Sequence, residues 1–320
     1  MILWLKKHCA YCLGNIVKRN GFYTNGKQRW FCRTCKRSFS WSNIHGKHQK
    51  EQIWFQRWIA EGYSVRQLVQ QSGHSRAKLY RIINYWLNVK PAIAKTRMDK
   101  YQYLIFDGSY LHQQVGLVAV MTGGSNTIIS GKYAVKETTE QQLSPFFQSL
   151  KDLGLKPFSF TVDGNPLVIK VLNRLWPEII IQRCLVHIQR QGLMWCRSYP
   201  KTSYARKLRN IFLKVTNIRT SSERDQFLEI INQWETHYGQ YLVTRPERGR
   251  VFSDIKRARS MLIKALPDMF HYLDNPNIPF STNGIEGYFS RLKSHYRQHR
   301  GLANLKLNNY FNWYFFLRPK

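Results

Sequence analysis

Apolar residues recur along this chain in two different patterns. Between residues 50 and 88 they return every three or four positions, as in Ile53, Trp54 and Trp58, which predicts three helices. From residue 101 onwards, short runs rich in β-branched and aromatic residues alternate with helical stretches. Strands that alternate with helices predict an α/β fold.

The α/β region has a predictable order of elements. A helix is expected over 140–150, and Gly123-Gly124 separates two strands of a predicted three-stranded meander. Residues 192–275 show helical patterns without strands, which predicts an all-helical insertion. The strands are expected at 103–106, 115–121, 127–133, 158–162 and 179–181.

The second and third helices of the 50–88 region predict a helix-turn-helix pattern. Ser64 is expected to cap the second helix, and the break at 72–75 precedes the third. In such a unit the N-terminal part of the later helix enters the major groove of DNA. An ordinary packing unit of three helices is the alternative. The residues expected to contact bases or phosphates are Ser75, Arg76, Lys78 and Arg81.

Four of the six cysteines form two Cys-x2-Cys pairs near the start of the chain, Cys9 with Cys12 and Cys32 with Cys35. This is the spacing of a zinc ribbon, in which four thiolates occupy the corners of a tetrahedron. We predict a structural Zn²⁺ site rather than two disulfides, because no export signal is recognisable and disulfides are rare in a reducing cytoplasm. The ribbon residues expected to contact DNA are Arg29, Arg33, Lys36 and Arg37.

The charge balance identifies the class of partner. Fifty Lys and Arg against eighteen Asp and Glu give a formal net charge of +32, which favours binding to nucleic acid. No uninterrupted apolar stretch of about 18 residues is present to span a bilayer. We therefore expect a cytoplasmic, nucleoid-associated protein with no membrane partner.

Acidic residues are scarce in this basic chain, and two of them have matching surroundings. Asp107 follows an apolar run and precedes Gly108, and Asp163 follows another and precedes Gly164. Ligand-binding groups of α/β sheets collect where strands end, so these two carboxylates are expected to bind the same cation. The alternative is that each Asp-Gly pair only begins a turn.

Glu286 is the third acidic candidate and lies at the start of a predicted helix. It shares one helical face with Ser290, Lys293 and Arg297, which gives a lone carboxylate flanked by cations that suit phosphates. A capping role beside Asn283 is the alternative interpretation of the same carboxylate. The residues expected to contact DNA here are Lys293, Arg297 and Arg300.

At these residues the chain resembles the Mutator-type DDE transposases of bacterial insertion sequences, in their zinc-binding variant. The resemblance spans nearly the whole chain and its motifs follow the family's order. They are Phe-Asp-Gly at 106–108, Val-Asp-Gly at 162–164, Arg-Cys-Leu-Val-His at 183–187, Thr-Asn-Gly-Ile-Glu at 282–286 and Arg-Leu-Lys at 291–293.

The resemblance implies an RNase H-like catalytic core interrupted by the helical insertion, and Asp107, Asp163 and Glu286 as the catalytic triad. It also places Cys184 and His187 near the active site, as a Cys-x2-His signature. From the residues alone, Cys184 and His187 are either half of a second zinc site with Cys196, a packing element, or a contact to the DNA strand. The expected domains are a zinc ribbon (1–45), a helix-turn-helix domain (46–98), the first part of the core (99–191), the insertion (192–275) and the C-terminal helices of the core (276–320).

The chemistry expected of such a triad is metal-dependent phosphoryl transfer. Two Mg²⁺ ions (or Mn²⁺) about 3.5 to 4 Å apart would activate the attacking oxygen and stabilise the leaving oxygen. Water would cut the strand at a transposon end, and the freed 3′-hydroxyl would then attack target DNA. Expected partners are the terminal inverted repeats, target DNA and further copies of the chain, as a homodimer or higher homo-oligomer. A non-catalytic DNA-binding regulator and a junction nuclease that never joins strands are the rival interpretations.

Overall fold

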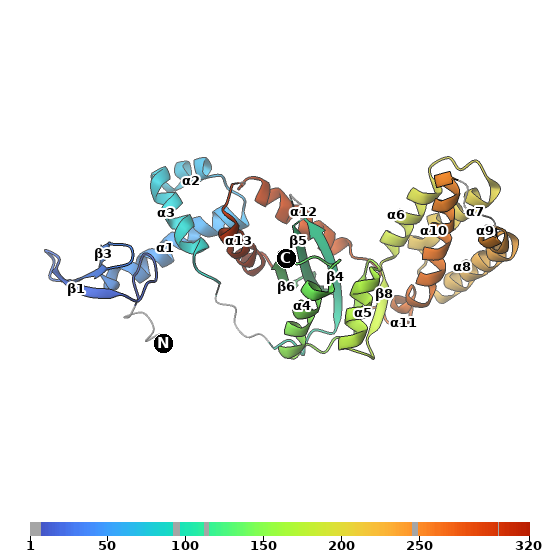
Figure 1. Cartoon of the computed structure of the whole chain (residues 1–320), viewed down its shortest axis with the longest axis horizontal. Helices are drawn as coiled ribbons and strands as arrows, with labels where there is room; N and C mark the ends of the chain where they lie inside the picture. The colour runs from blue at the N-terminus through green and yellow to red at the C-terminus, as the bar shows by residue number, and fades with distance from the viewer. Residues whose placement is uncertain (1–7, 92–96, 112–114, 245–248, 300) are drawn as a thin grey trace. The chain divides into compact units, whose positions relative to one another are not determined.

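The computed structural model describes residues 8–91, 97–111, 115–244, 249–299 and 301–320, and no side chains for 41–47 (Figure 1). The chain forms two compact units. Unit 1 contains residues 1–92 and 292–318, and unit 2 contains residues 93–291 and 319–320. No helix in the described ranges is long and apolar enough to cross a membrane.

Unit 1 begins with a small three-stranded antiparallel sheet. Its strands β1 (Val17–Phe22), β2 (Gln28–Cys32) and β3 (Ser38–Phe39) are arranged in that order. The turn between β1 and β2 uses Gly26, whose φ of 73° favours glycine. Few apolar side chains are buried here: the cluster consists of Cys9, Ala10, Cys32 and Phe39, with Val17, Trp30 and Cys35 partly buried against it.

Three helices follow: α1 (Trp41–Ala60), α2 (Val65–Ser72) and α3 (Arg76–Leu87). The first begins earlier than the predicted residue 50, because its opening turns carry few apolar residues that could reveal a helical rhythm. Ser64 caps α2 as predicted and forms a reciprocal capping box with Gln67. Gly73 then ends α2 in the left-handed conformation (φ 64°). The C-terminal helix α13 (Asn304–Leu317) packs against this group through the Trp313 indole, which donates to the carbonyls of Trp86 and Val89.

Unit 2 contains a five-stranded mixed sheet in the order β6-β5-β4-β7-β8. The strands β4, β5 and β6 form the predicted antiparallel meander, and β7 and β8 run parallel to β4. The bounds are β4 (Tyr103–Tyr110), β5 (Gly116–Thr122), β6 (Ile128–Tyr133), β7 (Ser159–Val162) and β8 (Ile180–Arg183).

Two helices cover one face of this sheet, α4 (Glu140–Asp152) and α5 (Pro166–Leu175). Their buried side chains pack with Leu104 and Phe106 of β4 and with Phe160 and Val162 of β7 in one core cluster. Because side chains alternate along a strand, Ile105 and Asp107 point to the opposite face. Asp107 is therefore directed away from the α4–α5 core.

A run of helices follows β8 in unit 2 and begins at residue 185, before the predicted residue 192. It comprises α6 (Leu185–Cys196), α7 (Ser203–Lys214), α8 (Ser221–Trp234), the π-helical turn η4 (Glu235–Gly239), α9 (Gln240–Thr244), α10 (Gly249–Ala265) and α11 (His271–Asp274). These helices share a core of their own that includes Phe212, Phe227 and Trp234. The insertion is tied to the sheet by Gln182 of β8, whose amide donates to the Met269 carbonyl and accepts from Tyr272 N.

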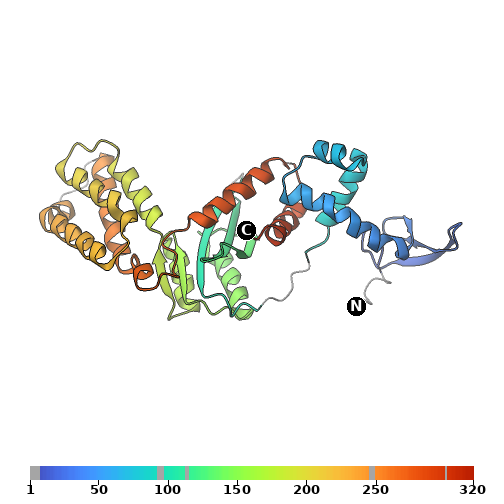
Figure 2. The same ribbon diagram turned by 180° about the vertical axis from the view of Figure 1, so that it is seen from behind.

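The chain returns from the insertion to the sheet and enters α12 (Asn283–Arg297), seen best from behind (Figure 2). The first turn of α12 lies on the sheet face opposite α4 and α5, since a Cβ built on Gly284 would be 3.4 Å from Met121 Sδ. Ile285 and Leu292 of the predicted apolar stripe are fully buried. This turn carries Glu286 to the face on which Asp107 lies.

Candidate active site

Asp107 and Asp163 lie on neighbouring parallel strands. The register pairs Leu104 with Phe160 and Ile105 with Thr161, and its continuation places Asp107 beside Asp163. Asp163 directly follows β7, as predicted. Asp107 does not end its strand, because β4 continues to Tyr110 in antiparallel pairing with β5. The Asp-Gly pair at 107–108 is therefore not a turn.

Short local hydrogen bonds orient both aspartates. The Gly108 amide donates to Asp107 Oδ1 (2.9 Å), and the Asn165 amide donates to Asp163 Oδ1 (2.9 Å). Asn165 in turn caps α5, so the turn after β7 is fixed at the point where Asp163 projects. Asp107 is buried, with 9% of its surface exposed.

Glu286 is held by cationic and polar neighbours at the start of α12. Its Oε2 accepts from Arg190 Nη1 at 3.2 Å, and its Oε1 lies 3.6 Å from His187 Nε2. The Thr282 hydroxyl lies 3.3 Å from the same Oε1. Thr282, rather than Asn283, precedes the helix, and its carbonyl accepts from the Glu286 amide.

Cys184, His187 and Thr282 form a connected network beside Glu286. Thr282 Oγ1 lies 3.4 Å from Cys184 Sγ and 3.2 Å from His187 Nδ1. A hydroxyl has one proton, so it donates to one neighbour and accepts from another. The hydrogen bond with Cys184 and the charges of Cys184, Glu286 and Asp107 raise the pKa of His187 to about 9, although burial opposes this. The raised pKa favours the protonated, cationic form of His187 beside Glu286.

The same contacts decide the state of Cys184. Burial opposes ionisation of this thiol, but the hydrogen bonds from His187 and Thr282 outweigh it and lower the pKa of Cys184. A shared metal with Cys196 does not fit, because the two cysteines flank α6 at opposite ends, about 18 Å apart by the helical rise. Cys184 and His187 instead contact Thr282, and His187 also contacts Glu286.

A fourth carboxylate, Glu137, lies in this site and was not predicted from the sequence. It precedes α4, where an acidic residue resembles ordinary helix-end chemistry. Burial raises the pKa of Glu137 to about 7, with a further contribution from the charge of Asp163. Burial also raises the pKa of Asp107 to about 8, followed by the charges of Glu137 and Asp163. The signal that could have revealed Glu137 is the pair of glycines, Gly108 and Gly116, that its segment crosses.

The carboxylates converge without meeting at one point. Within the described ranges, the four thiols of the cysteine pairs are the only group of three or more ligand atoms that all lie within 4.8 Å of one another. Asp107, Asp163 and Glu286 are gathered at one end of the sheet but are not that close as a set. Their donor atoms are carboxylate oxygens, which is the chemistry that Mg²⁺ and Mn²⁺ prefer.

The two cysteine pairs meet as predicted. Cys9 Sγ lies 3.5 Å from Cys35 Sγ, and Cys12 Sγ lies 3.6 Å from Cys32 Sγ. The Tyr11 amide donates to Cys9 Sγ at 3.3 Å, as backbone amides do around a thiolate metal site. Four sulfur donors with no open position suit a structural Zn²⁺ ion.

The predicted DNA-contacting residues differ in their surroundings. Arg76 and Arg81 of α3 are exposed, whereas Lys78 is 3.6 Å from Glu51 and Ser75 caps the helix. Arg29 is half-buried and donates to the Asn20 carbonyl at 2.7 Å. Arg300 lies outside the described residues. The remaining residues are exposed Arg33, Lys36, Arg37 and Arg297 and half-buried Lys293.

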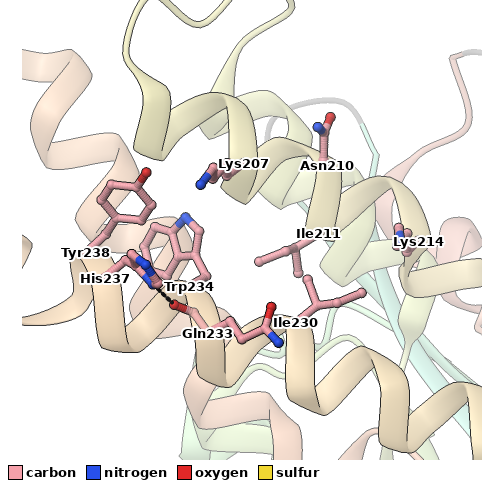
Figure 3. Close-up of a pocket in the computed structure, with 9 residues that line it drawn as sticks. All are labelled: Lys207, Asn210, Ile211, Lys214, Ile230, Gln233, Trp234, His237 and Tyr238. Atoms are coloured by element: carbon pink, nitrogen blue, oxygen red, sulfur yellow. Dashed lines mark hydrogen bonds between the residues drawn. The ribbon is translucent and has the colours of Figure 1, made fainter.

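A separate hollow of about 410 Å³ lies between α7, α8 and η4 of the insertion (Figure 3). Its lining includes Lys207 and Lys214 together with the aromatic side chains of Trp234 and Tyr238. Figure 3 shows the His237 ring hydrogen-bonded to the Gln233 carbonyl at its edge. The described residues that line this hollow include no carboxylate.

Comparison with known proteins identifies a family similarity. Residues 93–248 match the family model described as Transposase, Mutator family. The match covers a little under half of the chain, includes Asp107, Glu137 and Asp163, and ends before Glu286. This similarity supports a transposase. No protein of curated function matches the chain.

Among solved structures, the chain is similar to the Drosophila P element transposase strand transfer complex. The TM-score is 0.45 at 12% sequence identity, with 85% of this chain and 92% of that chain covered.

Proposed function

We propose that this protein is a DDE-type DNA transposase with an RNase H-like core, in which Asp107, Asp163 and Glu286 are the catalytic carboxylates. The observation that carries the proposal is the parallel pairing of β4 with β7, which sets the two aspartates side by side. The mixed five-stranded sheet and the long helical insertion before Glu286 support the assignment of the core.

The residues of the site suit metal-dependent cleavage of a phosphodiester. Bound Mg²⁺ or Mn²⁺ would supply activation of the attacking oxygen and stabilisation of the leaving oxygen. Asp107, Asp163 and Glu286 would hold the metal through carboxylate oxygens. Arg190 and His187, which contact Glu286, would release that carboxylate to the metal and remain beside it as cations for DNA phosphates.

We assign end recognition to unit 1. The zinc-stabilised ribbon presents exposed Arg33, Lys36 and Arg37, and α3 of the helix-turn-helix presents Arg76 and Arg81. An overall charge of +32 supports binding to a polyanion along several surfaces. DNA, as transposon ends and target, is the proposed partner, and two or more copies of the chain are proposed to act together on it.

Cleavage of DNA from the ends of the transposon that encodes this protein tests the proposed function. Purified protein with Mg²⁺ or Mn²⁺ should nick a labelled end duplex and join it to a second duplex. Asp163→Asn should bind this DNA with unchanged affinity and cut it at least about a thousandfold more slowly, since it removes a metal ligand. Asp152→Asn, the same change at an exposed residue of α4, is the matched control.

The products also separate the rival functions. Equal cutting by wild type and Asp163→Asn would remove Asp163 from the mechanism. Cutting without any joined product would identify a nuclease, and binding without cutting by every form would identify a regulator.

A further inference from the structure

Glu137 occupies a place that two glycines leave open. After β6 the chain crosses β5 at Gly116, where an added Cβ would collide with the backbone of Val135 and Lys136. It then brings Glu137 over β4 at Gly108, where an added Cβ would lie 2.8 Å from the Glu137 carboxyl. The crossing thus places this carboxylate against the residue that follows Asp107.

Among the described residues, the Glu137 carboxyl has no partner that would explain its position. Its Oε2 is inaccessible to solvent and makes no hydrogen bond. It is not the cap of α4, because Thr139 occupies that position and Glu140 is the acidic residue of the first turn. Glu140 also pairs with Lys170 (3.0 Å) and Arg174 (2.6 Å), whereas no ion pair of Glu137 is found within the described ranges.

A carboxylate oxygen that is buried without a partner among like charges is costly unless a cation compensates it. The charged groups that act on Glu137 and its neighbour Asp107 are Asp163 and His187. When all three carboxyls are ionised, their charges outweigh those of the His187 imidazolium and of the Arg183 guanidinium, which lies beside Asp163. The negative charge that remains at this edge of the sheet is what a divalent cation neutralises.

We propose that Glu137 is a fourth carboxylate of the divalent-cation site formed by Asp107 and Asp163. This inference rests on the proposed function and extends it by naming a ligand outside the triad. Glu137 would contribute a carboxylate oxygen from the segment that lies over Gly108 of β4.

Mn²⁺ binding to the zinc-loaded, full-length protein tests this without relying on activity. Free Mn²⁺ is counted by electron paramagnetic resonance during titration. Glu137→Gln should raise the dissociation constant at least about tenfold, as loss of a carboxylate around a metal does. Glu178→Gln, the same change at an exposed residue before β8, should bind like wild type.

Thermal melting separates a ligand from a structural residue. Without added metal, Glu137→Gln should melt at a higher temperature than wild type, because it removes an unpaired buried charge. Addition of Mn²⁺ should raise the melting temperature of Glu137→Gln less than it raises that of wild type. A lower melting temperature without metal would show that Glu137 stabilises the fold instead, and would overturn the inference.

Gly108→Ala provides a second route to the same group. Its methyl group displaces the end of a flexible side chain, so the protein should fold while the Glu137 carboxyl moves. Mn²⁺ affinity should fall as in Glu137→Gln, and the double variant should bind no worse than either single variant. Independent, additive losses would contradict a shared cause.

Asp163→Asn distinguishes the two levels of the proposal. If it loses Mn²⁺ while Glu137→Gln retains wild-type affinity, only the inference about Glu137 fails. If the wild-type protein binds no more Mn²⁺ than Asp163→Asn does, both the inference about Glu137 and the metal site of the proposed function fail.

Discussion

Gly164 is a residue at which backbone conformation and side-chain packing impose the same requirement. Its φ of 99° is rarely adopted by residues with a side chain. The guanidinium of Arg183, itself buried, lies where a Cβ would be. Both conditions fix the chain directly after Asp163, so this glycine sets the direction of the carboxylate before it.

Gly164→Ala should therefore destabilise unit 2 more than a positive φ alone explains. Gly154→Ala is the matched control, because Gly154 has a similar φ of 87° but no atom within 4 Å of the position that an added methyl group would take. We expect a cost of about 1 to 2 kcal/mol for the control and clearly more for Gly164→Ala. Urea unfolding measures both, and equal costs would show that Arg183 yields without penalty.

The buried carboxylates make the metal-free protein sensitive to pH. Burial and neighbouring charges raise the pKa of Asp107 from 3.8 to about 8, and that of Glu137 from 4.5 to about 7. A raised pKa in the folded state means that protonation favours folding. This stabilisation is complete below about pH 4 and is lost as pH rises through 7 to 8.

The melting temperature without metal should accordingly fall between pH 5 and 9, and Asp107→Asn should flatten the decline. Mg²⁺ should raise the melting temperature more at pH 8.5 than at pH 6, because the cation competes with protons for the same oxygens. Asp152→Asn should leave the profile unchanged. A wild-type profile that rises with pH would contradict the burial of these groups.

At the scale of elements, the ribbon sheet depends on its cysteines. Only a small cluster of apolar residues is buried there, too few to hold three short strands by themselves. We expect a strong zinc chelator to abolish the ordered amide signals of β1 to β3 while those of β4 to β8 persist, as followed by hydrogen exchange. Zinc should restore the signals, and Mg²⁺ should not.

A second prediction at this scale concerns the arginines of α3. Arg76→Ala and Arg81→Ala should each weaken binding to the proposed transposon end by about 1 to 3 kcal/mol if they contact bases, with little change for unrelated DNA. Lys156→Ala, which removes an exposed charge from the loop before β7, is the control. Competition titration gives both affinities. Equal weakening on both DNAs would assign the arginines to phosphates.

At the scale of the whole molecule, the excess of positive charge governs non-specific binding. With a net charge of +32, the protein should lose affinity for unrelated duplex DNA steeply as salt rises. Six to ten phosphate contacts correspond to a loss of about 10³ to 10⁵ between 50 and 200 mM salt. Fluorescence anisotropy at several salt concentrations measures the slope, and a nearly flat slope would mean that the charge does not face DNA.

Local chemistry in the sequence determined several features of this protein. The Cys-x2-Cys pairs predicted the gathering of four sulfurs, and Ser64 was correctly identified as a cap, because both depend on residues close together in the chain. The meander, the buried strands and the helical insertion also follow from periodicity, which records the face that each element buries.

Only the tertiary structure decided how the candidate site is assembled. Asp107 lies inside β4 rather than at its end, and Glu137 reaches Gly108 because the chain crosses Gly116. Thr282 meets Cys184 across 98 positions of the sequence. Such contacts depend on which strands pair and where a crossover returns, and periodicity along the chain contains no information about either.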